Sequence, residues 1–200
     1  MIRTNWGYFI DADALPPLID AATFVSMSGG AFAITDERIE TTLASVSAAV
    51  RNACGWHVSP SMSCRCETHA DGAAFSLPAM GVSSIDSIEV GGETVSTTAY
   101  EWREDGMVRS VPPYRWPRSW RSIVVEFTAG YDAAASADLA AVVSQIAANQ
   151  LAASPGVRRE QAGGVSIDYN LTGSGGAGGV SLLERDLALL APYMLPSVPA

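Results

Sequence analysis

Two hydrophobic periods alternate along the chain. Within residues 35–55 apolar side chains recur every three or four positions, which is the spacing of one face of an α-helix. Between residues 56 and 131 the period changes to two, as in strands that bury one face. A helical period returns after residue 136. The pattern therefore predicts an antiparallel β unit inserted between helices.

Residues 35–55 carry the clearest helix signals. Thr35 or Asp36 is suited to cap the N-terminus. Arg51 suits the negative end of the helix dipole, and Gly55 suits a left-handed residue beyond the C-terminus. The apolar stripe consists of Ile39, Leu43, Val46 and Val50. Such a stripe is typical of a helix that packs against a core.

A shorter helix is predicted within residues 11–30. Pro16 and Pro17 fit its first turn because proline is favoured where helical N–H groups have no partner. Gly29 and Gly30 mark its end. Its apolar side comprises Leu18, Ile19, Ala22 and Val25.

Strand-like alternation fills most of the inserted segment. Gly91-Gly92 and Asp105-Gly106 are expected hairpin turns, because both supply the residues that tight turns require. The strand-like stretches are 74–80, 83–96, 99–110 and 122–131.

Three cysteines and two histidines gather in the sixteen residues from Cys54 to His69, enough ligands for a zinc ion. The spacing favours another interpretation, since Cys64 and Cys66 alternate with polar residues as on one face of a half-buried strand. We expect a strand here, with zinc as the alternative. A disulfide is disfavoured by the odd number of cysteines.

A proline-stiffened loop at 111–120 carries aromatic and basic residues in turn. Tyr114, Trp116 and Trp120 alternate with arginines, a composition typical of protein–protein contacts. Two alternatives stay open. In one, the rings stack on nucleobases or sugars; in the other, they close the end of a small β core.

The helix predicted after Ser136 is rich in alanine. Ser136 is suited to cap it, and Pro155-Gly156 to end it. Leu139, Val142, Val143, Ile146 and Leu151 form its apolar side. Small residues allow another helix or subunit to approach closely, so we predict a contact through Ala141, Ala148 and Ala152.

The C-terminal part combines an extended segment around Gly163-Gly164, a glycine-rich linker and a final helix. Ser181 and Glu184 are in capping-box register at the start of that helix. An isolated helix this short is marginal in water, so it must return to its own core or dock on a neighbouring chain. We predict docking through Leu183, Leu187 and Leu190. A chain that ends at Leu171 is expected to fold but not to join a larger assembly.

Charge and composition exclude several classes. The net charge is −9, with twelve arginines and no lysine. This charge argues against a protein that binds nucleic acid through its phosphates. No stretch approaches the roughly 20 apolar residues of a membrane span. Nothing at the N-terminus resembles a signal peptide, so we expect synthesis in a cytoplasm.

No enzyme signature emerges. The "FTAGYDAAAS" turn lacks the glycines and lysine of a phosphate-binding loop, and "GSGGAGG" precedes no suitable strand-to-helix turn. Neither histidine can be assigned to a nucleophile by spacing. We assign no catalytic, cofactor-binding or metal-binding residues and expect no cofactor.

The order of motifs resembles the head-tail connector (adaptor) family of long-tailed bacteriophages. The motifs are "AAVRNACGWHVSP", "FSLPAM", "VSSIDSIEVGGETV", "YEW", "RWPRSW", "IVVEFTAGYD", "GGVSIDYN" and "LLERDLALLAPYMLP". The "TAGY" turn and the pattern of Gly164, Ser166 and Tyr169 are the most specific pieces. The resemblance extends over nearly the whole chain.

This resemblance implies an α+β fold: a helical core of three to four helices, an inserted antiparallel β unit and a tethered C-terminal helix. The corresponding parts are residues 1–55 with 132–156, residues 56–131, and residues 157–200. It also implies a structural virion protein in the neck, at the head-tail interface. Its subunits would form a ring, expected to be dodecameric, between the portal protein and a downstream stopper or tail protein, with DNA passing through the centre and no membrane involved.

The candidate interface residues are Tyr114, Trp116, Trp120, Ala141, Ala148, Ala152, Tyr169, Leu183, Leu187 and Leu190. Another neck or tail ring, such as a stopper or tail terminator, is one alternative. A monomeric carbohydrate- or nucleobase-binding module that uses the aromatic loop is the other.

Overall fold

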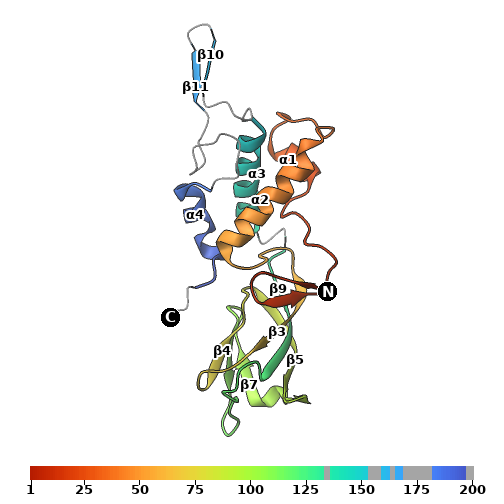
Figure 1. Cartoon of the computed structure of the whole chain (residues 1–200), viewed down its shortest axis with the longest axis vertical. Coiled ribbons are helices and arrows are strands. Elements are labelled where there is room, and N and C mark those ends of the chain that lie inside the picture. The colour runs from red at the N-terminus through yellow and green to blue at the C-terminus, as the bar shows by residue number, and fades with distance from the viewer. Residues whose placement is uncertain (133–135, 153–158, 163–164, 169–181, 197–200) are drawn as a thin grey trace. The chain divides into compact units, whose positions relative to one another are not determined.

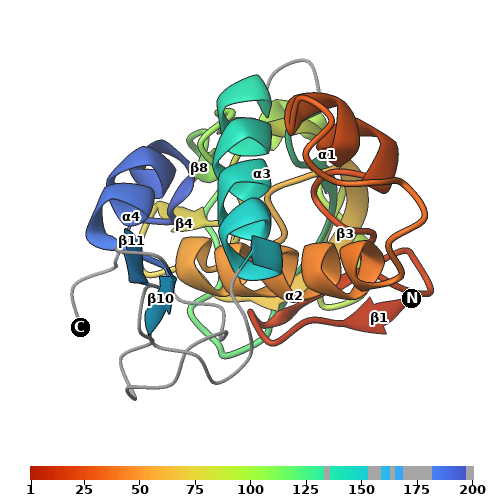
Figure 2. The same ribbon diagram turned by 90° about the horizontal axis from the view of Figure 1, so that it is seen from above.

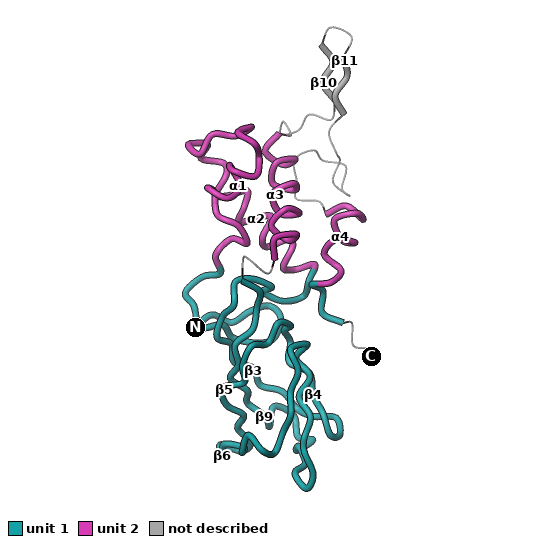
Figure 3. The backbone as a smooth tube through the Cα atoms, turned by 180° about the vertical axis from the view of Figure 1, so that it is seen from behind, with its two compact units in different colours: residues 1–15, 54–135, 193–200 teal, residues 16–53, 136–192 magenta. Residues whose placement is uncertain are grey.

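The computed structural model describes residues 1–132, 136–152, 159–162, 165–168 and 182–196. The chain forms two compact units, each assembled from segments distant in sequence (Figure 3). We call residues 1–15, 54–135 and 193–200 the β unit, and residues 16–53 and 136–192 the helical unit. The predicted α+β class, a helical core with an inserted antiparallel β part, is confirmed.

Four α-helices form most of the helical unit: α1 (Ala21–Met27), α2 (Arg38–Cys54), α3 (Ala137–Ala152) and α4 (Glu184–Leu190). α3 contacts α1 and α4 and crosses α2 steeply (Figures 1 and 2). Strands β10 (Arg159–Ala162) and β11 (Val165–Asp168) pair antiparallel in the extended segment predicted around Gly163-Gly164. None of the helices in the described ranges is long and apolar enough to span a membrane.

Helix α2 follows the predicted pattern. All four residues of its apolar stripe are buried: Ile39, Leu43, Val46 and Val50. Before the helix, Asp36 Oδ1 accepts a hydrogen bond from the Arg38 N–H at 3.0 Å, and after it Gly55 has φ +81°. Arg51 lies in the last turn, but its side chain is buried and donates to the Pro16 carbonyl at 2.8 Å.

Helix α1 starts later than the proline pattern predicts. Pro16 and Pro17 precede the helix rather than occupying its first turn. Asp20 is the N-cap, because its carboxylate accepts from the Thr23 N–H at 2.6 Å. The side chain that α1 buries is Phe24, whereas Ala22, assigned to the apolar side from the sequence, is exposed.

The β unit contains two antiparallel sheets. The larger has the strand order β1-β2-β3-β9-β5-β6 and the smaller β4-β8-β7 (Figure 1). The larger sheet comprises β1 (Ile2–Arg3), β2 (Tyr8–Ile10), β3 (Met62–Thr68), β5 (Val82–Val90), β6 (Glu93–Thr94) and β9 (Ile123–Ala129). The smaller comprises β4 (Ala74–Ser76), β7 (Tyr100–Trp102) and β8 (Met107–Ser110). Among the described residues, Thr97–Ala99 and Ala191–Tyr193 form 3-10 turns.

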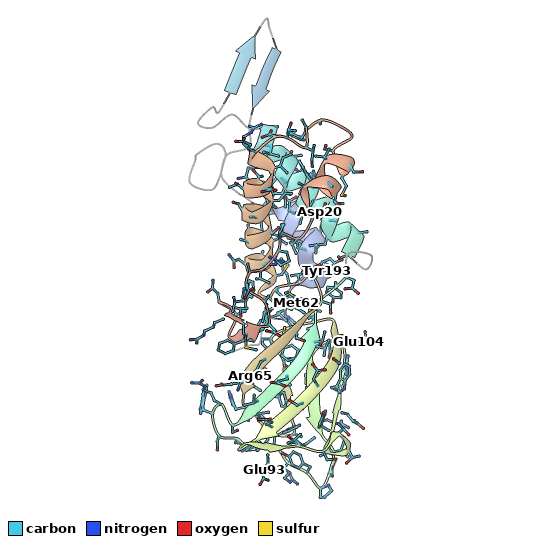
Figure 4. All side chains as sticks on the ribbon, turned by 90° about the vertical axis from the view of Figure 1, so that its right-hand side faces the viewer. Asp20, Met62, Arg65, Glu93, Glu104 and Tyr193 are labelled. Atoms are coloured by element: carbon cyan, nitrogen blue, oxygen red, sulfur yellow. The ribbon has the colours of Figure 1, made fainter. Side chains whose placement is uncertain are left out.

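Strand β3 explains the cysteine alternation. Figure 4 marks Met62 and Arg65 on this strand. Cys64 pairs with Ile10 on one side and Phe127 on the other, while Cys66 pairs with Tyr8 and Val125. All six of these residues are buried, which confirms the predicted half-buried strand. The N-terminal strands β1 and β2 were not predicted.

The expected hairpin turns are present. Gly91-Gly92 connects β5 to β6, and Asp105-Gly106 connects β7 to β8. A Cβ atom at Gly106 would lie 2.5 Å from the Ala79 carbonyl oxygen, so this turn admits only glycine.

Helix α4 begins at Glu184 with Leu183 as its N-cap, so the predicted capping box is displaced. The Asp186 carboxylate, not Glu184, accepts from the N-cap N–H, with 3.0 Å between Leu183 N and Asp186 Oδ2. Asp186 takes this role because it stands three residues after the N-cap. Ser181 lies outside the described residues, as do the glycine-rich linker and Pro155-Gly156.

Candidate interaction surfaces

The turn at residues 128–131 is built around Gly130. Its φ is +119°, and a Cβ atom there would lie 2.5 Å from the Pro60 carbonyl oxygen and 2.9 Å from His57 Nε2. The next residue, Tyr131, donates its N–H to the Val58 carbonyl at 2.8 Å. Close packing of backbone on backbone therefore requires glycine at this position.

His57 is a buried structural residue. Its N–H donates to Tyr8 Oη at 3.0 Å, and its Nε2 lies 3.0 Å from the Ala129 carbonyl oxygen, which can only accept. Nε2 therefore carries the proton, and Nδ1 accepts from Tyr8 Oη–H at 2.7 Å. Both ring nitrogens are engaged within the β unit, so neither is available to a metal ion or a nucleophile.

The cysteines are also structural. All three are free and buried. Burial raises the pKa of Cys54 to about 11 and that of Cys64 to about 12, so these sulfurs stay as unreactive thiols. Burial likewise raises the pKa of Cys66 to about 12. Within the described ranges, no three His, Cys, Asp or Glu side chains come close enough to hold a metal ion.

The segment after α4 belongs to the β unit. Tyr193, marked in Figure 4, is buried and meets the Tyr131 ring edge-on at 5.4 Å between centroids. The Trp56 indole N–H donates to the Tyr193 carbonyl at 2.6 Å. The Leu195 N–H donates to the Cys54 carbonyl at 3.0 Å. The sequence analysis did not predict that Tyr193 packs in the β unit. The local signal for it was a tyrosine between two prolines.

The aromatic loop divides into an inner and an outer part. Trp116 is only 4% exposed and packs against Phe75, Tyr100 and Tyr114, with ring centroids 5.1, 6.2 and 5.1 Å away. It therefore closes the end of the β core, as one of the open alternatives proposed. Among the described residues, its indole N–H has no hydrogen-bond acceptor.

Trp120 occupies the outer part and is 81% exposed. Its ring lies on the His69 ring, with centroids 4.4 Å apart. Next to it Arg121 has φ +54°, a left-handed conformation that is costly for a residue with a side chain. The Arg121 side chain donates to Glu67 Oε2 at 2.8 Å from Nε, and this hydrogen bond lowers the pKa of the Glu67 carboxyl. The bond ties the loop to strand β3.

A pocket of about 240 Å³ opens beside this loop. Arg115, Arg118, Tyr114 and Trp116 supply its aromatic and charged lining. The remaining lining comes from Gly72, Ala73, Ser110, Pro112 and Pro113.

Helix α3 presents one apolar and one small-residue face. The predicted apolar side is buried, as Leu139, Val142, Val143, Ile146 and Leu151 all show. Ala141 and Ala152 are exposed and Ala148 is partly exposed. Their spacings of seven and four residues place them on one face of the helix.

The leucines of α4 differ in exposure. Leu190 is fully buried, Leu183 is partly buried, and Leu187 is 37% exposed. Leu189, which sequence reasoning passed over, is 55% exposed. Tyr169 lies outside the described residues.

Solved structures with a similar fold come from gene transfer agent (GTA) particles. One chain is from the neck of an empty particle computed with C6 symmetry, at 17% identity and TM-score 0.61. Another is from the neck of a native particle computed with C12 symmetry, at 16% identity and TM-score 0.59. A third is from the virion of the native particle, at 18% identity and TM-score 0.63. Each match covers 96% of this chain and 97% of the other.

Comparison with curated protein sequences found no match. The sequence model of one family, described as "head completion protein", matches residues 17–145. Because this match spans more than half of the chain, the protein belongs to the head completion protein family, and the prediction of a structural head-tail protein of the virion, not an enzyme, is confirmed.

Proposed function

We propose that the protein forms a ring in the virion neck, between the portal protein and the next neck or tail protein, with DNA passing through its centre. The supporting observation is that 96% of the chain shares its fold with chains from gene transfer agent necks computed with C12 and C6 symmetry. The expected ring has twelve copies.

The acidic character of the chain suits this role. A channel wall must let phosphates slide past, and a net charge of −9 gives no general basic surface to hold them. The exposed alanines of α3 and the exposed Leu187 of α4 are the proposed contacts with neighbouring subunits or the portal.

Co-expression with the portal protein encoded by the same virus or prophage tests the proposal. Native mass spectrometry of the purified complex should give a fixed number of copies per portal ring, and negative-stain images should show a second ring on the portal. A protein that stays monomeric with and without the portal would contradict it.

Cross-linking in intact particles separates this position from that of a stopper or tail terminator. Cross-links to the portal place the ring directly beneath it, and cross-links to tail proteins alone place it further down. A monomeric binding module is not favoured because, of the two tryptophans in the aromatic loop, Trp116 is buried and Trp120 alone is exposed.

A further inference from the structure

Basic charge is concentrated in one segment of this acidic protein. Residues 106–125 contain four of the twelve arginines and no acidic residue, while the rest of the chain carries all 21 acidic residues. This segment includes the aromatic loop. It therefore differs in charge from the remainder of the molecule.

Two of the four arginines have partners within the chain. Arg109 lies 3.5 Å from Glu101, and Arg121 is bonded to Glu67. Arg115 and Arg118 are exposed, and neither forms an ion pair or side-chain hydrogen bond with any described residue. Two guanidinium groups are thus free to bind an external anion.

Both free arginines line the pocket of about 240 Å³, together with Trp116. Guanidinium groups pair best with carboxylates or phosphates. The pocket therefore suits an acidic group small enough to enter it.

A protein carboxylate fits this pocket better than DNA does. A pocket of about 240 Å³ accommodates carboxylate side chains, whereas a duplex presents a broad row of phosphates. Binding to that row takes many clustered basic residues, and only two here are free.

The same chain offers a matching surface at the start of α2. Glu37 and Glu40 are exposed there and form no ion pair with described residues. They line a hollow of about 350 Å³ together with Ile34, whose side chain is 56% exposed. Two free carboxylates beside an exposed apolar residue complement two free arginines in a loop that also carries the exposed Trp120.

We propose that the pocket formed by Arg115, Arg118 and Trp116 binds the acidic start of α2, at Glu37 and Glu40, in a second copy of this chain. Two different surfaces meet in this contact, so each copy can bind one neighbour through each surface. Such heterologous contacts generate rings when the rotation closes. The inference rests on the proposed ring and assigns one of its subunit contacts.

Charge exchange tests this contact. The variant with Arg115→Glu and Arg118→Glu should lose ring formation by roughly tenfold or more in apparent association constant, because like charges then face each other. Adding Glu37→Arg and Glu40→Arg to the same chain should restore it. The single variant Arg118→Glu is compared with Arg103→Glu, which reverses the charge of an exposed arginine that does not line this pocket.

Ring formation would be measured by native mass spectrometry with and without portal, at low and high salt, after circular dichroism confirms that each variant is folded. Loss on charge reversal, recovery in the four-residue exchange, and weaker association at high salt support the contact. Unchanged rings in the arginine variants overturn it, and so does a loss that the glutamate exchange fails to repair.

The DNA affinity of assembled rings tests the alternative that the pocket binds DNA phosphates rather than glutamate side chains. If the arginine variants form normal rings that bind DNA less tightly, the pocket contacts DNA and the proposal is wrong. A wild-type protein that never forms rings, alone or on the portal, contradicts the proposed function itself, an outcome distinct from failure of this contact.

Discussion

Two independent features exclude a side chain at Gly130. Its positive φ disfavours any side chain, and the Pro60 carbonyl occupies the space of a Cβ atom. Gly130→Ala should therefore lower the free energy of unfolding by about 2 kcal/mol or more. Chemical denaturation followed by tryptophan fluorescence would measure this.

Gly29 is the matched control for this substitution. It has φ +63°, but a Cβ atom there would meet nothing within 4 Å. Gly29→Ala carries only the conformational cost of about 1 kcal/mol. Equal losses in the two variants would show that the contact with Pro60 is unimportant.

The buried cysteines predict a defined pH dependence. Burial raises the pKa of Cys64 from 9.0 to about 12 and that of Cys54 from 9.0 to about 11, because the interior disfavours the thiolate. The raised pKa values stabilise the fold fully below pH 9.0, and this contribution is lost as pH rises toward 11 to 12. Unfolding free energy measured across this range should fall.

Alkylation gives an independent measurement on the same thiols. Iodoacetamide at mildly alkaline pH should leave the native protein unlabelled and label all three cysteines in denaturant, as mass spectrometry would report. Rapid labelling of the folded protein would contradict the buried strand face.

At the scale of elements, we expect the two faces of helix α3 to have different roles. The buried face stabilises the monomer, and the exposed face contacts another subunit. Ala141 is exposed, whereas Ala147 is fully buried. Ala141→Leu should change monomer stability by no more than about 0.5 kcal/mol but impair ring formation. Ala147→Leu should cost roughly 1–3 kcal/mol of monomer stability through overpacking.

Thermal unfolding and native mass spectrometry of both variants provide the comparison. Ala148→Leu and Ala152→Leu extend the test along the same face. Normal rings from all three surface variants, with unchanged melting temperature, would exclude this face as a subunit contact.

Helix boundaries show where local pattern reading fails. Pro16 and Pro17 were suited to a first turn, yet α1 starts only after Asp20. The Asp20 carboxylate satisfies the Thr23 N–H, and that bond sets the boundary. Several polar residues near a helix start can each serve as cap, and the surrounding packing selects one of them.

At the scale of the whole molecule, the contacts of Tyr193 and Leu195 within the β unit change the expectation for truncation. A chain that ends at Leu171 would lack Tyr193, leaving the Trp56 indole N–H without its acceptor and Tyr131 without one of its two ring partners. It would also lack the fully buried Leu190, a loss comparable to the roughly 2–5 kcal/mol cost of removing a core leucine. The truncated protein should therefore melt at a lower temperature as well as fail to assemble.

Point variants separate these two effects. Tyr193→Ala should destabilise the β unit, while Leu189→Ala, at an exposed position, should leave stability nearly unchanged. A truncated chain with the wild-type melting temperature would show that the segment after α4 adds nothing to the fold.

The sequence by itself determined the local features of this protein. The stripe of α2, the alternation in β3 and the hairpin glycines follow from periodicity and backbone preference, which depend only on near neighbours. The order of motifs along the chain also carried the family resemblance, because the order is itself a property of the sequence.

Only the tertiary structure decided which distant residues meet. Tyr8 and His57 are 49 residues apart, and Trp56 and Tyr193 are 137 apart, so no local period connects them. The same holds for the arginines: all four in residues 106–125 look alike in sequence, but folding brings Glu67 to Arg121 and leaves Arg115 and Arg118 without a partner among the described residues. Pairings of this kind depend on how the whole chain packs, since each is one outcome among many that the local sequence allows.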